Sequence, residues 1–140
     1  MREKRMSEKE LAAVQTIYAA FGAGDVDTIV ALCAEDVDWA AESSLMEAPW
    51  HGGHKGQCEV PRFFKAISES IEVTDFTPLA FATNDDGDVM AVINFAFTVP
   101  ATGKSSNMEI HHHWKFVNGK VVRYRGSEDT AQTAWALRTD

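Results

Sequence analysis

The chain has few cysteines, no long apolar run and no glycine-rich phosphate loop. Its two cysteines, Cys33 and Cys58, match neither a metal-binding spacing nor a redox pair, so we expect two reduced thiols. No apolar segment approaches the ~20 residues that span a bilayer. The charged start MREKRMSEKE lacks the apolar core of a signal peptide. Together with the missing phosphate loop, these features predict a cytoplasmic protein without an organic cofactor.

Acidic residues outnumber basic residues. The 21 Asp and Glu residues against 13 Lys and Arg residues give a formal net charge of -8 at pH 7. Such a surface repels phosphate backbones and anionic lipids, so we expect neither a nucleic-acid partner nor a membrane partner. The apolar share of 45% supports one core, and 140 residues is the size of one domain. We expect a single domain over residues 7–140 after a flexible N-terminus over residues 1–6.

Helical patterns dominate the first half of the chain. Capping residues and the helical spacing of apolar side chains predict helices that start after Ser7, after Asp25 and at Glu59. A short strand is expected over residues 37–41. The segment 42–56 is glycine-rich and has no regular period, which is compatible with a flap over a pocket and equally with a plain surface loop.

Strand patterns dominate the second half. Turn sequences (NDDG, ATGK and NG) separate four β-rich runs over residues 71–83, 89–99, 107–117 and 120–128. Asp129 then provides the cap of a last short helix. Helices followed by antiparallel strands predict an α+β fold.

The last hairpin decides which side chains point inward. A two-residue loop at Asn118-Gly119 places Arg125 opposite His112, whereas a three-residue loop places Tyr124 there. The second register keeps the arginines out of the core, so the hydrophobic pattern favours it. His112 then faces inward, opposite Tyr124, while its two histidine neighbours face outward.

Several short motifs resemble those of the SnoaL-like branch of the NTF2-like superfamily. They are AGDVD at 23–27, AEDV at 34–37, Gly56 with the phenylalanine pair at 63–64, and HHWKFVNGKV at 112–121. The resemblance covers nearly the whole chain. It implies a cone in which three N-terminal helices and a short C-terminal helix close a strongly curved, mixed or antiparallel sheet over a pocket. Proteins of this kind include ketosteroid isomerases, polyketide cyclases, hydrolases, dehydratases and non-catalytic binding proteins.

The strand alternation and the resemblance together give a candidate site. His112 is the candidate general acid/base and Tyr124 its candidate hydrogen-bond partner. Seven further residues are candidates for substrate binding: Tyr18, Trp39, Phe63, Phe64, Phe95, Trp114 and Glu128. A structural role explains each of them as well, since His112 also fits a hydrogen-bonded core histidine and Glu128 a solvated residue before a helix cap.

The catalytic residues of two characterised branches are not present. Ketosteroid isomerases carry an aspartate base where Ala41 stands here, and their first-helix tyrosine falls on Ile17. Limonene-epoxide-hydrolase-like enzymes carry an arginine and an aspartate where Ile110 and His112 stand. Two functions therefore remain open. One is an acid–base enzyme (isomerase, cyclase, dehydratase or hydrolase type) acting on an apolar molecule that bears a carbonyl or a hydroxyl. The other is a non-catalytic module of the same fold, either one that binds a small ligand or a dimerising accessory protein in which the cavity is only core.

The outward histidines raise the question of a metal. His111 and His113 share a face with Glu109, which is compatible with a surface zinc site. Three cationic side chains on the same face disfavour a dication, so we predict no metal: Lys115, Arg123 and Arg125. In proteins that this chain resembles, that face often forms a dimer. The resemblance therefore implies a homodimer through the outer sheet face, with Asn94 placed to hydrogen-bond across it.

Overall fold

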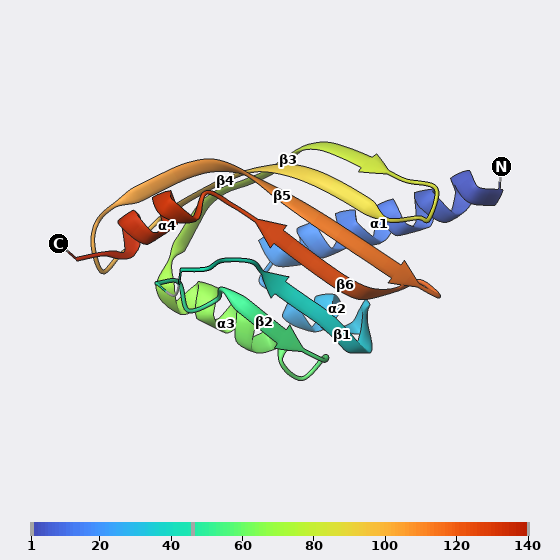
Figure 1. The fold of residues 1–140 in the computed structure, drawn as a ribbon, viewed down its shortest axis with the longest axis horizontal. Helices are drawn as coiled ribbons and strands as arrows, with labels where there is room; N and C mark the ends of the chain where they lie inside the picture. Colours follow the sequence, from blue (N-terminus) through green and yellow to red (C-terminus); the bar gives the residue numbers. More distant parts are fainter. Residues whose placement is uncertain (1, 46, 140) are drawn as a thin grey trace.

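The computed structural model describes residues 2–45 and 47–139, with side chains described from residue 8 onward. Helices and strands follow one another as the α+β pattern predicts (Figure 1). In chain order they are α1 (Arg2–Gly22), α2 (Val26–Ala31), β1 (Cys33–Ala41), β2 (Gly52–Lys55), α3 (Val60–Ser70), β3 (Glu72–Thr83), β4 (Val89–Thr98), β5 (Ser105–Val117), β6 (Lys120–Ser127) and α4 (Thr130–Leu137).

The six strands form one curved mixed sheet in the order β2-β1-β6-β5-β4-β3. Only β1 and β6 pair in parallel, and every other neighbouring pair is antiparallel. Helix α1 runs behind the sheet in Figure 1 and contacts β3 and β4, whereas α3 lies beside β2. Helix α4 packs against β5 near the end of the sheet. The space between α1, α3 and the concave face of the sheet holds the core and the candidate site.

Local sequence signals explain most element boundaries. Asp25 accepts a hydrogen bond from the backbone N–H of Thr28 and caps α2, and Asp129 does the same for α4 through Gln132. Gly24 between α1 and α2 has φ +71°, a conformation that favours glycine. The predicted start of the first helix after Ser7 was wrong, because α1 begins at Arg2. The flexibility expected for residues 1–6 stays a prediction.

Two boundaries in the first half of the sheet also differ from expectation. Strand β1 begins at Cys33 rather than at residue 37. The segment 42–56, expected to be loop throughout, contains strand β2, in which His54 pairs with Trp39 of β1. Strand β2 is four residues long and lies at the sheet edge, with one neighbour to pair with, so it leaves little periodicity in the sequence.

The β5–β6 hairpin follows neither of the two predicted registers at His112. Asn118 and Gly119 have φ 51° and 79°, as in a two-residue turn, and Val117 pairs with Lys120. The register then shifts between Lys115 and Phe116, as at a β-bulge. This shift places Gly126 opposite His112, so the prediction of Tyr124 at that place was wrong. The prediction that the side chains at 112, 114 and 124 share one face agrees with the lining of the cavity described below.

Candidate functional site

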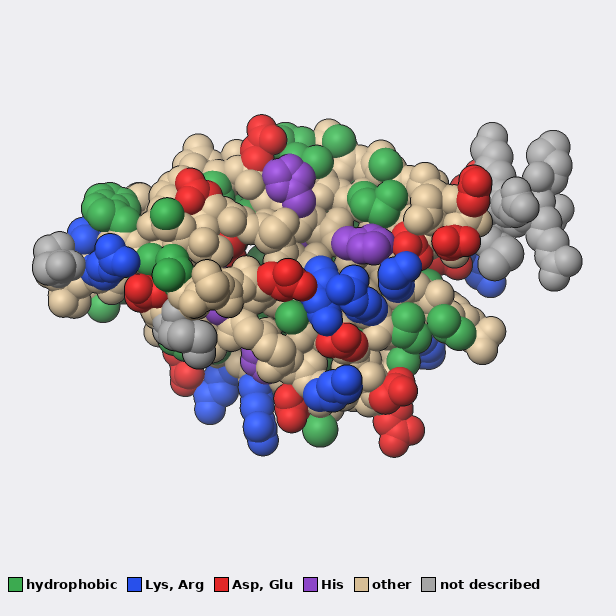
Figure 2. Space-filling model, viewed as in Figure 1, with side chains coloured by type: hydrophobic (Ala, Val, Ile, Leu, Met, Phe, Trp, Pro, Cys, Tyr) green, Lys and Arg blue, Asp and Glu red, His purple; other side chains and the backbone are tan. Residues whose placement is uncertain are grey.

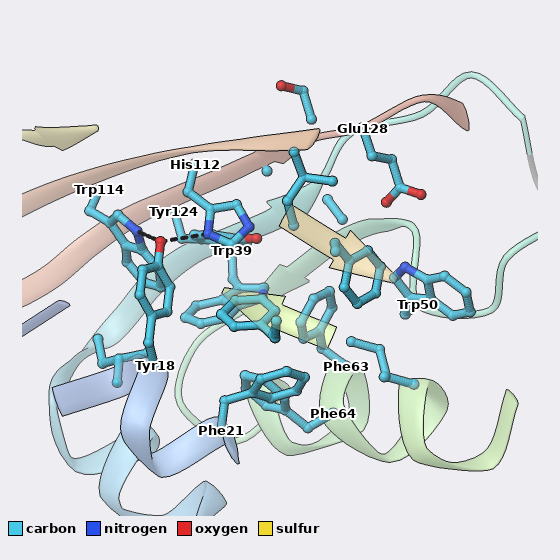
Figure 3. Close-up of a pocket in the computed structure, with 18 residues that line it drawn as sticks. Tyr18, Phe21, Trp39, Trp50, Phe63, Phe64, His112, Trp114, Tyr124 and Glu128 are labelled. Atoms are coloured by element: carbon cyan, nitrogen blue, oxygen red, sulfur yellow. Dashed lines mark hydrogen bonds between the residues drawn. The ribbon is translucent and has the colours of Figure 1, made fainter. Parts of the chain in front are cut away.

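The concave side of the sheet, α1 and α3 enclose an apolar cavity of about 70 Å³. That space holds roughly five water molecules. Aromatic and aliphatic side chains form most of its wall, and Figure 3 shows them arranged around the central space. The lining residues are Ile17, Tyr18, Phe21, Trp39, Ala41, Trp50, Phe63, Phe64, Ile67, Phe76, Phe95, Ile110, His112, Trp114, Tyr124, Gly126, Ser127 and Glu128.

All nine residues proposed from the sequence lie in this wall. His112 and Tyr124 come from the central strands β5 and β6, and the seven candidates for substrate binding surround them. Phe97, which alternation also turns inward, is fully buried in the core instead of lining the cavity. The structure therefore brings the candidates together in space, while their roles remain predictions.

Three side chains form a hydrogen-bonded chain at one end of the cavity (Figure 3). The indole Nε1–H of Trp114 donates to the hydroxyl oxygen of Tyr18 over 3.1 Å. The same hydroxyl lies 2.7 Å from Nδ1 of His112. Trp114 and His112 lie two residues apart on β5, so their side chains share its inner face, and α1 brings Tyr18 onto both. The partner of His112 is therefore Tyr18 on the first helix, and not Tyr124 as the sequence suggested.

This chain fixes the tautomer of His112. The indole nitrogen of Trp114 is a donor only, so the Tyr18 oxygen must accept from it. A buried hydroxyl proton needs an acceptor, and among the described residues His112 Nδ1 is the one that lies within reach of it. Nδ1 is consequently unprotonated, and Nε2 carries the hydrogen. No described residue hydrogen-bonds Nε2, which Figure 3 shows turned towards the space between Trp39 and Glu128.

Burial keeps His112 neutral. Part of the residue is accessible, but the rings of Tyr18, Phe76, Trp114 and Tyr124 enclose its imidazole at centroid distances of 5.1 to 6.4 Å. Removal from water, and to a lesser degree the nearby charge of His111, lowers the pKa of His112 to about 3. Burial likewise raises the pKa of Tyr18 above its ordinary value, although the hydrogen bond from Trp114 opposes the rise. At neutral pH His112 is a hydrogen-bond donor and a poor base, which differs from the near-neutral titration assumed from its residue type.

Two further polar groups in the wall lack a protein partner. The indole Nε1 of Trp39 is buried and has no hydrogen-bond acceptor among the described residues. Tyr124, whose ring packs on Trp39 at 4.3 Å, has a hydroxyl that no described residue hydrogen-bonds. Burial raises the pKa of Tyr124 well above its ordinary value, and the charges of Tyr18 and Glu128 add to the rise, so its proton stays in place. Trp39, Tyr124 and His112 thus each carry a donor without an acceptor among the described residues, and the Trp39 nitrogen has almost no accessible surface.

Gly126 makes room for this arrangement. It lies opposite His112 on the neighbouring strand. A Cβ atom added there would clash with the Tyr124 hydroxyl and would lie 3.3 Å from His112 Cδ2. The absence of a side chain at 126 leaves room for the Tyr124 ring, which packs nearly perpendicular to the imidazole with an interplanar angle of 77°.

The opposite end of the cavity carries a carboxylate. Glu128 lines the cavity, and its side chain is only 10% exposed. His51 Nε2 lies 3.1 Å from Glu128 Oε1, and the fully buried Thr133 of α4 donates its hydroxyl to Oε2. The His51 side chain is 3% exposed, and the neighbouring Trp50 lines the cavity. Sequence reasoning left His51 and Trp50 in a loop, because the segment has no period that would show which of its side chains are buried.

The outer face of the sheet carries ion pairs. Asp88 is buried and accepts from His113 at 3.0 Å and from Lys115 at 2.9 Å. Burial alone raises the pKa of Asp88, but hydrogen bonds from Lys115, His113 and Asn84 outweigh it and lower that pKa. Figure 2 shows Lys, Arg and His side chains gathered on this face. Among the described residues no group of three or more His, Cys, Asp or Glu side chains is placed to hold a metal.

The structure gives Asn94, on the outer face of the sheet, a hydrogen-bond partner within the chain. Asn94, expected to hydrogen-bond across a dimer, donates instead to Asp75 on the adjacent strand β3 over 2.6 Å. The amide is thus already paired within the chain.

In the part of the chain that the structure describes, no helix is both long and apolar enough to cross a bilayer.

Comparisons with known proteins agree with this architecture. Residues 14–124 match the model of the SnoaL-like domain. An NTF2-like protein of unknown function from Burkholderia pseudomallei has a TM-score of 0.84 at 24% identity, over 92% of this chain and 97% of that one. A candidate polyketide cyclase from Xanthomonas campestris scores 0.76 at 19% identity, over 95% and 99%. A candidate isomerase from Bacillus subtilis scores 0.81 at 18% identity, over 96% of both chains. A search of curated proteins found no match.

Proposed function

The chain belongs to the SnoaL-like domain family, and from this premise we propose that its cavity binds a small, largely apolar molecule bearing a carbonyl or a hydroxyl. We propose acid–base chemistry of the isomerase, cyclase, dehydratase or hydrolase type at that group. The fold is shared with proteins named as candidate cyclases and isomerases, which supports this class without selecting a member of it.

The observation that carries the proposal is the hydrogen-bonded chain from Trp114 through Tyr18 to His112. It presents a neutral imidazole Nε2–H to an apolar cavity, in a fixed orientation. A preorganised donor in such a place stabilises negative charge that develops on a carbonyl oxygen. Tyr124 supplies a second donor beside it. In this proposal His112 acts through its proton as an acid or electrophile, and the aromatic wall excludes water.

Ring ketones of increasing size, starting from acetophenone, provide the test. We expect them to shift the His112 ring resonances and to raise the melting temperature. Chemistry is followed by 1H NMR, as loss or rearrangement of C–H signals in D₂O. A His112→Gln variant is expected to lower turnover, while His111→Gln, which changes an exposed neighbour, is the matched control. Failure of every ring ketone to bind, or equal turnover by the His112 variant, would contradict the proposal.

A second candidate function is ligand binding without chemistry. It is favoured by the low pKa of His112, since a histidine that stays unprotonated to about pH 3 does not accept protons near neutrality. This version predicts ligands that bind tightly and are recovered unchanged after prolonged incubation. Turnover of any bound ligand rules it out.

We also propose that the outer sheet face pairs two copies of the chain. That face is hollowed by about 590 Å³, with apolar and cationic lining that includes Met90, Val92, His111 and Arg123. Sedimentation equilibrium tests the assembly. A Val92→Glu variant is expected to shift a dimer to monomer, and a monomeric wild-type protein contradicts the pairing.

A further inference from the structure

The cavity has two chemically different ends. His112, Tyr124 and Trp39 carry donors without protein acceptors, as described above. The other end carries Glu128, a group that accepts hydrogen bonds when it is ionised. Figure 3 places Tyr18 and Trp114 at one end and Glu128 and Trp50 at the other, with His112 and Trp39 between them.

Glu128 is held in place from two separate segments of the chain. Thr133 reaches Oε2 from the first turn of α4, and His51 lies at 3.1 Å from Oε1 at the end of the loop before β2. Both residues are almost fully buried, but only Thr133 hydrogen-bonds the carboxylate, since neither ring nitrogen of His51 has a hydrogen-bond partner among the described residues and His51 contacts Glu128 by proximity alone. A carboxylate that served only the surface would not need two buried partners at the wall of an apolar cavity. The arrangement instead fixes the direction in which the carboxylate faces.

We propose that Glu128, positioned by His51 and Thr133, accepts a hydrogen bond from a hydroxyl group of the ligand. The ligand is then a hydroxyketone-like molecule: a carbonyl oxygen takes the donors of His112, Tyr124 and Trp39, an apolar ring fills the space between, and a hydroxyl meets Glu128. This inference rests on the proposed function, because it assigns the second end of the same cavity. Glu128 touches the ligand, whereas His51 and Thr133 are positioning residues that act through it.

The chemistry of the wall favours a neutral hydroxyl over a charged group at this end. An anionic ligand group would be repelled by Glu128, and a cation would lose its water on entering an aromatic cavity. A hydroxyl group costs less free energy to remove from water than a charged group does. One charge-assisted hydrogen bond to Glu128 offsets that cost.

The test compares acetophenone with 3- and 4-hydroxyacetophenone by calorimetry on the full chain. The two isomers place the hydroxyl at different distances from the carbonyl. We expect at least one of them to bind the wild type roughly tenfold more tightly than acetophenone does, as expected for one hydrogen bond to a charged group. In Glu128→Gln this preference falls to about twofold or less, while acetophenone affinity stays unchanged. Glu42→Gln, at an exposed carboxylate, keeps the preference.

The outcomes separate the inference from the proposed function. Equal binding of all three ketones by the wild type overturns the role of Glu128 but leaves the carbonyl site standing. Failure of all three to bind overturns both. If Glu128→Gln unfolds, His51→Gln serves in its place, because it removes the imidazole that lies against Oε1, and it is expected to weaken only the hydroxyketone. An unchanged preference in a folded His51→Gln variant contradicts the proposal.

Discussion

Tyr18 and His112 are 94 residues apart in the chain, yet their side chains meet in a 2.7 Å hydrogen bond that sets the protonation of the imidazole. Helix α1 carries the hydroxyl and strand β5 carries the ring. Because Trp114 occupies the Tyr18 oxygen from the other side, the hydroxyl proton points at Nδ1. The relationship between these two residues therefore decides which nitrogen of His112 faces the cavity.

Replacing Tyr18 by Phe is expected to remove the hydrogen bond that sets the tautomer of His112. The buried Trp114 N–H loses its acceptor, so the free energy of unfolding should fall by about 1–3 kcal/mol. The ring nitrogens of His112 should shift towards a tautomer mixture, which ¹⁵N NMR detects directly. Tyr124→Phe is the control, since it removes a hydroxyl that does not bond His112. An unchanged nitrogen spectrum in Tyr18→Phe would contradict the tautomer assignment.

The pH dependence of stability follows from the low pKa of His112. In the unfolded chain histidine has a pKa near 6.5, whereas in the folded protein it is about 3. Between these values the unfolded state binds the extra proton, so stability rises with pH and is lost as pH falls from 6.5 towards 3. This one residue adds a slope of up to about 1.4 kcal/mol per pH unit.

Urea unfolding at several pH values between 4 and 7 measures this slope. His112→Gln should flatten it, while His111→Gln, at the exposed neighbour, should leave it close to that of the wild type. In the wild type the His112 ring resonances should not titrate between pH 5 and 8. A His112 titration midpoint near 6.5 would show that its ring is not enclosed as described.

The alternation of β5 was enough to predict that His112 points into the molecule, because a period of two is robust once a strand is recognised. Its cross-strand partner was not predictable, since the register shift between Lys115 and Phe116 leaves no mark in residue type. The turn itself matched the Asn118-Gly119 signal. The turn has two residues rather than the three that the hydrophobic pattern favoured, and the bulge after it places Gly126 instead of Tyr124 opposite His112.

The residues that contact the site side chains could not be derived from local sequence patterns. Tyr18 is 7% exposed in α1, but helical periodicity does not show which residue its hydroxyl group contacts. His51 lies in a segment without period, and its ring lies against Glu128 and Trp50. Contacts between distant segments need coordinates, because one sequence gives periodicity and not proximity.

Gly126→Ala tests the fit between the two central strands. The added methyl group meets the Tyr124 hydroxyl, so the Tyr124 ring must move, and we expect a loss of about 1–3 kcal/mol in unfolding free energy. In a Tyr124→Phe background the nearest clashing atom is gone, and the loss should become smaller. A double-mutant cycle by urea denaturation gives the difference. Additive effects would show that Tyr124 does not lie over Gly126.

The two buried tryptophans provide a matched comparison of a satisfied and an unsatisfied donor. Trp39 and Trp114 are each 1% exposed, but only Trp114 has an acceptor for its Nε1–H. Substitution by Phe removes a similar volume at both positions. Trp114→Phe also deprives Tyr18 of its donor, so it should cost about 1–3 kcal/mol more than Trp39→Phe in urea unfolding.

Trp39→Phe and Trp114→Phe should affect ligand affinity in the opposite order to their effect on stability. The buried N–H of Trp39 has no acceptor among the described residues, so we expect a ligand carbonyl to pair with it, whereas the N–H of Trp114 is already used. Trp39→Phe should therefore weaken acetophenone by roughly tenfold while costing less stability, because the wild type keeps a buried donor unpaired until a ligand arrives. Calorimetry on both variants measures this. Equal affinity of wild type and Trp39→Phe would mean that the indole N–H meets water or nothing in the complex, and the carbonyl would then depend on His112 and Tyr124 alone.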